Sequence, residues 1–179
     1  MYLNMAHVIA EANAHPAFRL KYKGVFDFDK LTTMIVKWLQ DRNFDFNESK
    51  HKHKYSCPHG FEIERDFDGW RKIDDYYMHK VEVKFHLYDA FEVDAVKHGK
   101  KVKLWNAQMD IQLGFDVVCD YQNKWSKSPF MDKLHKNFYT QYVIKKEIII
   151  KNADPLYYKL LSLHSKIKEF LEMETATNF

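Results

Sequence analysis

Alternation of apolar and polar residues runs through the middle of this chain, from residue 44 to residue 121. A period of two places successive side chains on opposite faces of a β-strand, so this region predicts long strands with one buried face. Turn residues interrupt the alternation at Asp68-Gly69, Asp74-Asp75 and His98-Gly99. Because short turns join neighbouring strands in opposite directions, we expect the sheet to be antiparallel.

The first predicted hairpin has a register that charge alone favours. Residues 44–55 and residues 61–67 both alternate between apolar and polar, so each predicts a strand. The segment Cys57-Pro58-His59-Gly60 between them supplies the turn. A hairpin that pivots on Pro58 pairs a lysine with an acid at three successive positions, and a one-residue slip would lose all three pairs. The pairs are Lys54 with Glu62, Lys52 with Glu64, and Lys50 with Asp66.

The second predicted hairpin is longer and contains irregularities. The apolar phase that starts at Val81 is interrupted by Asp89, where we expect a bend or a bulge. A turn at His98-Gly99 places Val93 opposite Leu104 and Ala95 opposite Val102. The apolar phase then shifts, which predicts one extra residue near Trp105 or Asn106.

Helical spacing precedes and follows the predicted sheet. A short strand with a basic outer face covers residues 18–22, and an apolar stripe predicts a helix over residues 30–42, capped by Asp27 or Asp29 and closed by Asn43. Ser128-Pro129 and Asp154-Pro155 each predict the start of a C-terminal helix. The stripe of the first is Leu134, Phe138 and Tyr142, and that of the second is Leu156, Leu160, Leu163, Ile167 and Leu171.

The sequence therefore predicts an α+β fold with a long, bent antiparallel sheet of about five to six strands. One helix follows the first strand, and two C-terminal helices pack on one face. Over residues 17–172 this order resembles the helix-grip fold of lipid-transfer and cyclase-like proteins, in which a curved sheet wraps a long C-terminal helix. The resemblance implies a cavity, and the candidate lining is Phe85, Leu87, Asp89, Met109 and Ile111. A filled core is the competing interpretation, and we favour it because native interiors are close-packed.

We divide the chain into three parts. Residues 1–15 form an N-terminal arm with helical spacing, residues 16–174 form a single domain, and residues 175–179 are a frayed end. The arm carries Met5, Val8 and Ile9 in a narrow apolar stripe. A helix this short is marginal alone in water, so we expect these three residues to contact another copy of the chain.

Composition excludes several classes of protein. Only 5 glycines occur in 179 residues, too few for a loop that cradles nucleotide phosphates. The apolar runs are too short to span a bilayer, and the N-terminal residues do not form a secretory signal. The 2 cysteines, Cys57 and Cys119, are too few for a secreted disulfide scaffold. We expect a soluble, cytoplasmic protein.

The densest group of metal-ligand residue types is His51, His53, Cys57 and His59. Zinc requires ligands that converge on one point, whereas His51 and Cys57 on an extended strand lie as much as about 20 Å apart. We therefore predict no metal and no cofactor. Two histidines on the inner face of a hairpin are the better interpretation.

Nucleic-acid binding and catalysis have weaker support. Basic segments at residues 21–23, 50–54 and 97–101 lie near aromatics, but the net charge is only +3. The sequence has none of the nucleophile, zinc or P-loop motifs that would favour an enzyme. Aromatic residues make up 16% of the chain, and those beyond the needs of the core favour contact with other proteins. We expect a non-enzymatic domain that binds a protein partner or a second copy. A hydrophobic small molecule or lipid is the alternative ligand, and nucleic acid is the second alternative.

Overall fold

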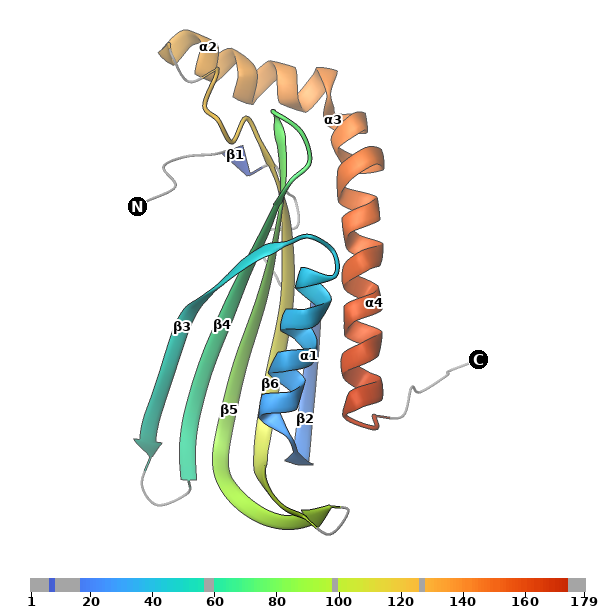
Figure 1. Ribbon diagram of the computed structural model, residues 1–179. Helices are drawn as coiled ribbons and strands as arrows, with labels where there is room; N and C mark the ends of the chain where they lie inside the picture. The colour runs from blue at the N-terminus through green and yellow to red at the C-terminus, as the bar shows by residue number, and fades with distance from the viewer. Residues whose placement is uncertain (1–6, 9–16, 57–59, 98–99, 126–127, 174–179) are drawn as a thin grey trace.

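A computed structural model describes residues 7–8, 17–56, 60–97, 100–125 and 128–173 (Figure 1). Two strands precede the first helix, four strands follow it, and helical segments complete the chain. The strands are β1 (His7–Val8), β2 (Phe18–Phe26), β3 (Asp45–Ser56), β4 (Gly60–Lys72), β5 (Tyr77–Lys97) and β6 (Lys100–Cys119). The helical segments are α1 (Phe28–Gln40), α2 (Pro129–Leu134), η1 (His135–Val143), α3 (Lys145–Glu147), η2 (Ile148–Ala153) and α4 (Asp154–Phe170).

The strands form one antiparallel sheet in the order β3, β4, β5, β6, and both β1 and β2 pair with the outer edge of β6. β2 pairs with the stretch of β6 from Trp105 to Leu113, and β1 pairs with its last residues, Val118 and Cys119. The α+β class, the antiparallel sheet and the helix after the first strand are thus as the sequence predicts.

Both predicted hairpins have the expected register. Lys52 lies opposite Glu64, with the flanking lysines opposite Glu62 and Asp66. In the second hairpin Val93 lies opposite Leu104. The charge pattern and the turn position were therefore sufficient to align these strands.

The irregularity near Asp89 is a bulge on β5. The register shifts between Tyr88 and Phe91, and Asp89 has a φ of 49°, in the left-handed region. The bulge moves Ala90 into the buried position that Asp89 would otherwise take. Because this one extra residue accounts for the change of phase, the second bulge predicted near Trp105 or Asn106 is wrong: the pairing of β6 with β2 is regular there.

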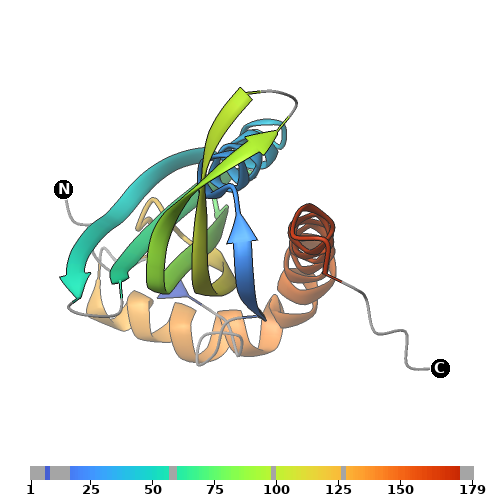
Figure 2. The same cartoon turned by 90° about the horizontal axis from the view of Figure 1, so that it is seen from below.

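Helix α1 lies against the concave face of the sheet (Figure 2). Asp27 caps it by accepting a hydrogen bond from the backbone N–H of Lys30 at 3.0 Å, and Asn43, with a φ of 57°, follows its end. Its apolar stripe is buried at Leu31, Ile35 and Leu39. The helix begins two residues earlier than the predicted 30–42.

The C-terminal segments form two helical rods. The first, α2 with η1, crosses one end of the sheet, and the second, α3 with η2 and α4, runs along the molecule beside α1 (Figure 1). The chain turns between them at Ile144. The five apolar residues predicted as the stripe of the second rod are all buried and belong to the core that α1 and the sheet also form. They are Leu156, Leu160, Leu163, Ile167 and Leu171. Among the described residues, no helix is both long and apolar enough to cross a membrane.

Candidate functional site

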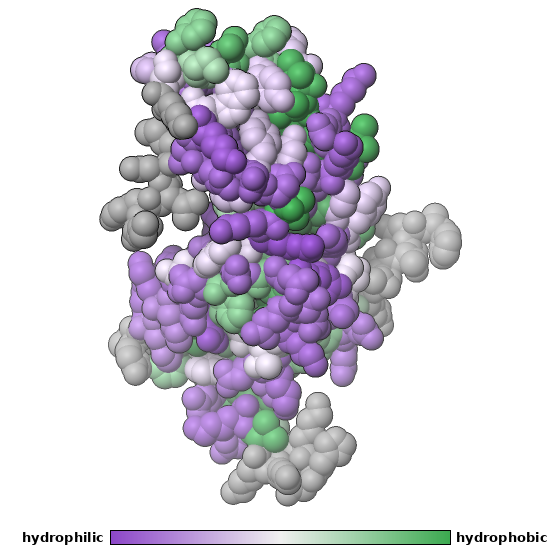
Figure 3. Space-filling model, turned by 45° about the horizontal axis from the view of Figure 1, so that its top comes forward, coloured by the Kyte–Doolittle hydropathy of each residue, from purple (hydrophilic) through white to green (hydrophobic). Residues whose placement is uncertain are grey.

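The first rod carries a row of large apolar side chains that the protein leaves uncovered. We call Phe130, Leu134, Phe138 and Tyr142 the apolar arm face. Their exposed fractions are 72%, 40%, 56% and 77%, and the rings of Phe138 and Tyr142 lie 5.8 Å apart. Apolar residues gather over α2 and η1 in the space-filling view (Figure 3). A contiguous apolar patch of this kind on a folded protein is typical of a binding surface.

The sequence places three of these residues on the buried side of the helix, and that expectation is wrong. The physical reason is that polar and aromatic contacts of His135, with Tyr76 and Trp125, set which side of this π-helix packs on the sheet. Its hydrogen bonds join residues five apart, as from the Ile144 N–H to the Tyr139 carbonyl at 3.1 Å. Buried positions then recur five residues apart, at His135 and Thr140. The row spaced by four faces outward instead.

His135 anchors the rod to the end of the sheet. Its side chain is 1% exposed, and its Nε2 lies 2.5 Å from the hydroxyl of Tyr76, which precedes β5. The imidazole stacks on Trp125 and Tyr139 at centroid distances of 5.1 and 5.9 Å. Burial lowers the pKa of His135 and raises that of Tyr76, so a hydrogen bond joins a neutral imidazole to a neutral hydroxyl.

The loop that leads into the rod is held by Asp120. Its carboxylate accepts hydrogen bonds from the backbone N–H groups of Lys124 at 2.8 Å and Trp125 at 3.0 Å. The neighbouring Cys119 is buried, and burial raises the pKa of its thiol to about 12. The thiol therefore stays protonated at neutral pH and is a packing group rather than a nucleophile. This junction fixes the orientation in which the apolar arm face is presented.

The face of the sheet opposite the core carries an ion-pair ladder between β3 and β4. Lys50 and Lys54 both contact the carboxylate of Glu64, and Lys54 also reaches Glu62 at 3.3 Å. Hydrogen bonds from the two ammonium groups lower the pKa of Glu64 to about 2. This face is polar and solvated, as expected for the uncovered side of an antiparallel sheet.

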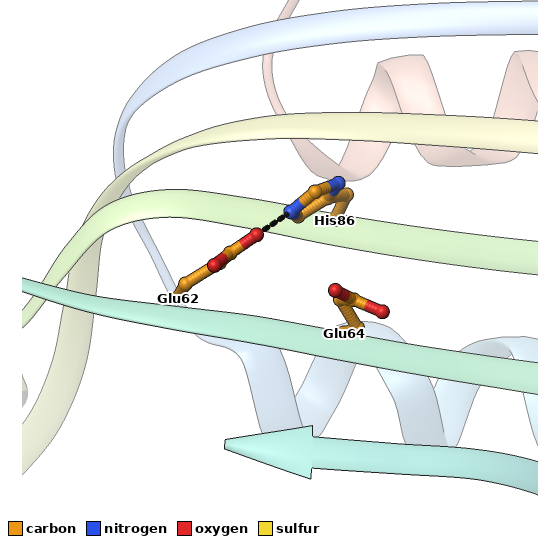
Figure 4. Close-up of side chains that lie close together, drawn as sticks. All are labelled: Glu62, Glu64 and His86. Carbon is orange, nitrogen blue, oxygen red and sulfur yellow. Dashed lines mark hydrogen bonds and ion pairs between the residues drawn. The ribbon is translucent and has the colours of Figure 1, made fainter. Parts of the chain in front are cut away.

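Three residues of this face carry groups of the kind that ligate cations. Glu62, Glu64 and His86 bring one ligand atom each within 4.8 Å of one another, and His86 Nε2 lies 2.6 Å from Glu62 (Figure 4). Carboxylate and imidazole are suitable zinc ligands. However, Lys50 and Lys54 already neutralise the two carboxylates, and a cation would have to displace both ammonium groups. The geometry favours a self-contained ladder.

The candidate cavity residues separate into two groups. Phe85, Leu87, Met109 and Ile111 lie together in the core, each at most 2% exposed. Asp89 is exposed and lines a hollow on the outer face of the sheet, because the bulge turns it away from the core.

The histidine cluster is only partly described. His51 is exposed and lies 3.1 Å from Glu48. His53 is exposed, and its ring lies 5.1 Å from Phe61. Cys57 and His59 lie outside the described residues, so the structure does not test convergence of all four.

The N-terminal arm is described at His7 and Val8 alone. Both residues pair with the end of β6 in the same chain, in an extended conformation. Met5 and Ile9 lie outside the described residues. The predicted contact of the arm with another copy stays a prediction.

Sequence reasoning did not single out Tyr76 and His135 as a pair. They are 59 positions apart, and no local periodicity links them. The signal that was available is the polar His135 next to an apolar stripe. This signal identifies the buried side of the rod only when the residues that pack against His135 are known.

Comparison of the chain with models of protein families, with curated proteins and with solved structures found no match.

Proposed function

We propose that this domain acts through protein contacts made by the apolar arm face, with a second copy of the chain as its partner. The observation that carries the proposal is the exposure of Phe130, Leu134, Phe138 and Tyr142 on one rod. Aromatic residues are enriched in the centres of protein interfaces, where they bury much area at a small cost in side-chain entropy.

The way in which the rod is anchored supports the proposal. His135 holds its inner side, through Tyr76 and the stacked ring of Trp125, and Thr140 donates a hydrogen bond to the carbonyl of His135 within the rod. A surface fixed before binding loses less conformational entropy when a partner docks. The apolar arm face is thus both exposed and held in place by the contacts beneath it, which suits specific binding of another protein surface. A reducing compartment such as the cytoplasm belongs to the same proposal and rests on the sparse cysteines.

The alternative, a hydrophobic ligand held between helices and sheet, has less support. Its four apolar candidate residues are packed into the core with α1 and α4. No observation on these residues favours a bound molecule over the side chains that already surround them.

The test is the molecular mass of the full chain by size exclusion with light scattering, over a range of concentrations. We expect the wild type to form dimers or larger assemblies and Phe138→Ser/Tyr142→Ser to shift toward the monomer. Val25→Ser is the matched control, because Val25 is 46% exposed on β2, away from the rod. A wild type that stays monomeric at high concentration contradicts self-association, and an unchanged mass in the double variant contradicts the role of the apolar arm face.

A further inference from the structure

The outer face of the sheet contains a hollow that neither the core nor the apolar arm face uses. It has a volume of about 550 Å³, within the usual range for small-molecule sites. β2, β5 and β6 form it, around the bulge. Its principal polar lining is Arg19, Lys21, Lys23, Tyr88, Asp89 and Gln108.

The charge of the hollow favours an anion. Asp110 is neutralised by Arg19, whose Nε and Nη2 donate to its carboxylate at 2.9 and 2.6 Å. Lys21 and Lys23 form no ion pair within the described part of the chain. Lys21 lies directly across from Asp110 and also faces its charge. Three cations, Arg19, Lys21 and Lys23, thus line the hollow with two carboxylates, Asp89 and Asp110, and one net positive charge remains. A phosphate group is the common biological anion that two lysines bind.

The hollow also offers an aromatic platform. Tyr88 is 42% exposed, and one side of its ring stacks on His86 at a centroid distance of 3.9 Å and an angle of 28°. A ring braced in this way presents a rigid flat surface on which a planar ring can stack. The bulge places Asp89 beside it with a strained, positive φ, and residues held in such conformations cluster at functional sites.

The sheet register sets the distance between the platform and the cations. Lys23, Gln108 and Tyr88 lie directly across from one another on β2, β6 and β5. Two steps of strand spacing separate the backbones of Lys23 and Tyr88 by about 10 Å. Lys23 and Tyr88 therefore line the same hollow from β2 and β5, with β6 between them.

We propose that this hollow binds a nucleotide, free or within a single strand, with the base stacked on Tyr88 and the phosphate held by Lys21 and Lys23. Asp89 and the amide of Gln108, which lie 3.4 Å apart, supply acceptors and donors for the edge of the base. Stacking and phosphate contacts of this kind are how sheets bind unpaired nucleotides with little preference for sequence. The site is independent of the apolar arm face.

The test titrates the full chain with AMP and with a single-stranded oligodeoxyadenylate, followed by amide NMR shifts and calorimetry. Adenosine, which lacks the phosphate, and ribose 5-phosphate, which lacks the base, are the matched ligands. We expect saturable shifts at Tyr88, Gln108 and Lys23 with AMP and much weaker binding of both fragments. Tighter binding of the oligonucleotide than of AMP identifies a strand as the ligand, and equal binding identifies a free nucleotide.

Variants separate this site from a generally basic surface. Tyr88→Ala should weaken AMP binding about tenfold or more through lost stacking, while Tyr88→Phe retains it. Lys21→Gln/Lys23→Gln should weaken binding and reduce its dependence on salt. Lys166→Gln on α4 is the control, and thermal melting confirms that each variant folds. Absence of saturable binding, ribose 5-phosphate binding as tightly as AMP, or an unaffected Tyr88→Ala would each overturn the proposal.

Discussion

At the scale of single residues, buried polar side chains determine how the helical rods sit on the sheet. Tyr76 and His135 join the start of β5 to the π-helix, and His79 and Asn152 join β5 to the second rod at 3.2 Å. Each of these pairs lies between an apolar sheet face and a helix. An interior polar group costs free energy unless it is paired, so these contacts specify one docking position over its neighbours.

Replacing Tyr76 with Phe tests the first of these pairs. The ring remains, but the buried Nε2 of His135 loses its hydrogen-bond partner, and we expect the free energy of unfolding to fall by about 1–3 kcal/mol. Urea denaturation measures the change. Tyr158→Phe is the control, since Tyr158 is 66% exposed, and it should change stability little. Equal effects of the two variants would show that the hydrogen bond is not important.

The same histidines make stability depend on pH. Burial lowers the pKa of His79 and of His135 below the usual value near 6.5. The unfolded chain then binds protons more readily than the folded one, so stability is full above about pH 6.5 and falls as pH decreases toward the folded pKa values. Urea denaturation at pH 7.5 and 5.5 should show a lower free energy of unfolding at pH 5.5. His135→Gln should reduce the difference, and a pH-independent wild type would contradict the assignment.

At the scale of elements, the ladder between β3 and β4 shows how charge aligns a hairpin. Each exposed pair contributes little to stability, but the row of pairs opposes a slip that would place like charges together. β3 is also an edge strand of the sheet, and its exposed lysines and histidines at residues 51–54 discourage edge-to-edge pairing with another sheet.

Reversing one charge of this ladder should therefore lower the stability of the protein by a measurable amount. Lys52→Glu places a carboxylate directly opposite Glu64, and we expect a loss of about 0.2–1 kcal/mol relative to Lys52→Gln. The loss should shrink in high salt, which screens exposed charges. Thermal melts at low and high ionic strength measure both effects. A loss that is independent of salt would point to packing rather than charge.

The lysines of the ladder should also control metal binding. Wild-type protein should show no change in melting temperature with added zinc, because Lys50 and Lys54 occupy the carboxylates beside His86. Lys50→Met/Lys54→Met frees these ligands and should gain a zinc-dependent rise in melting temperature. Adding His86→Ala should remove that rise. Zinc stabilisation of the wild type would show that the ammonium groups are displaced easily.

At the scale of the whole molecule, local patterns predicted the elements and neighbouring pairs, and they failed where distant segments meet. The alternation at residues 81–87 and the lysine–acid pairs of β3 and β4 need only nearby sequence to interpret. Pairing of β2 with β6 joins residues 79 to 95 positions apart, and no periodicity encodes such a contact.

The candidate sites show the same division. The residues of the apolar arm face are visible in the sequence as a stripe, but the assumption that an apolar stripe is the buried side of a helix places them wrongly. The hollow needs Lys23, Gln108 and Tyr88 from three strands in one register. Only the assembled sheet brings those residues together.

Removing residues 1–15 tests how far the fold depends on its N-terminal arm. The described core begins at Leu20, so the shortened chain should fold with a melting temperature close to that of the full chain. It loses two residues of pairing at the end of β6, which predicts a small loss. Circular dichroism and thermal melting measure both, and light scattering detects any fall in mass. Failure to fold would place the arm within the core.

The pairing of β2 with β6 has a consequence for synthesis on the ribosome. Arg19 and its partner Asp110 are 91 residues apart, so translation at about 5–20 residues per second delays their meeting by about 5–20 s. During this interval Leu20 and Phe26 have no strand to cover them. We expect the alternating cations of β2, Arg19, Lys21 and Lys23, to oppose aggregation of the segment during this interval. A nascent chain arrested before residue 105 should therefore leave β2 open to protease, and release of the full chain should close it.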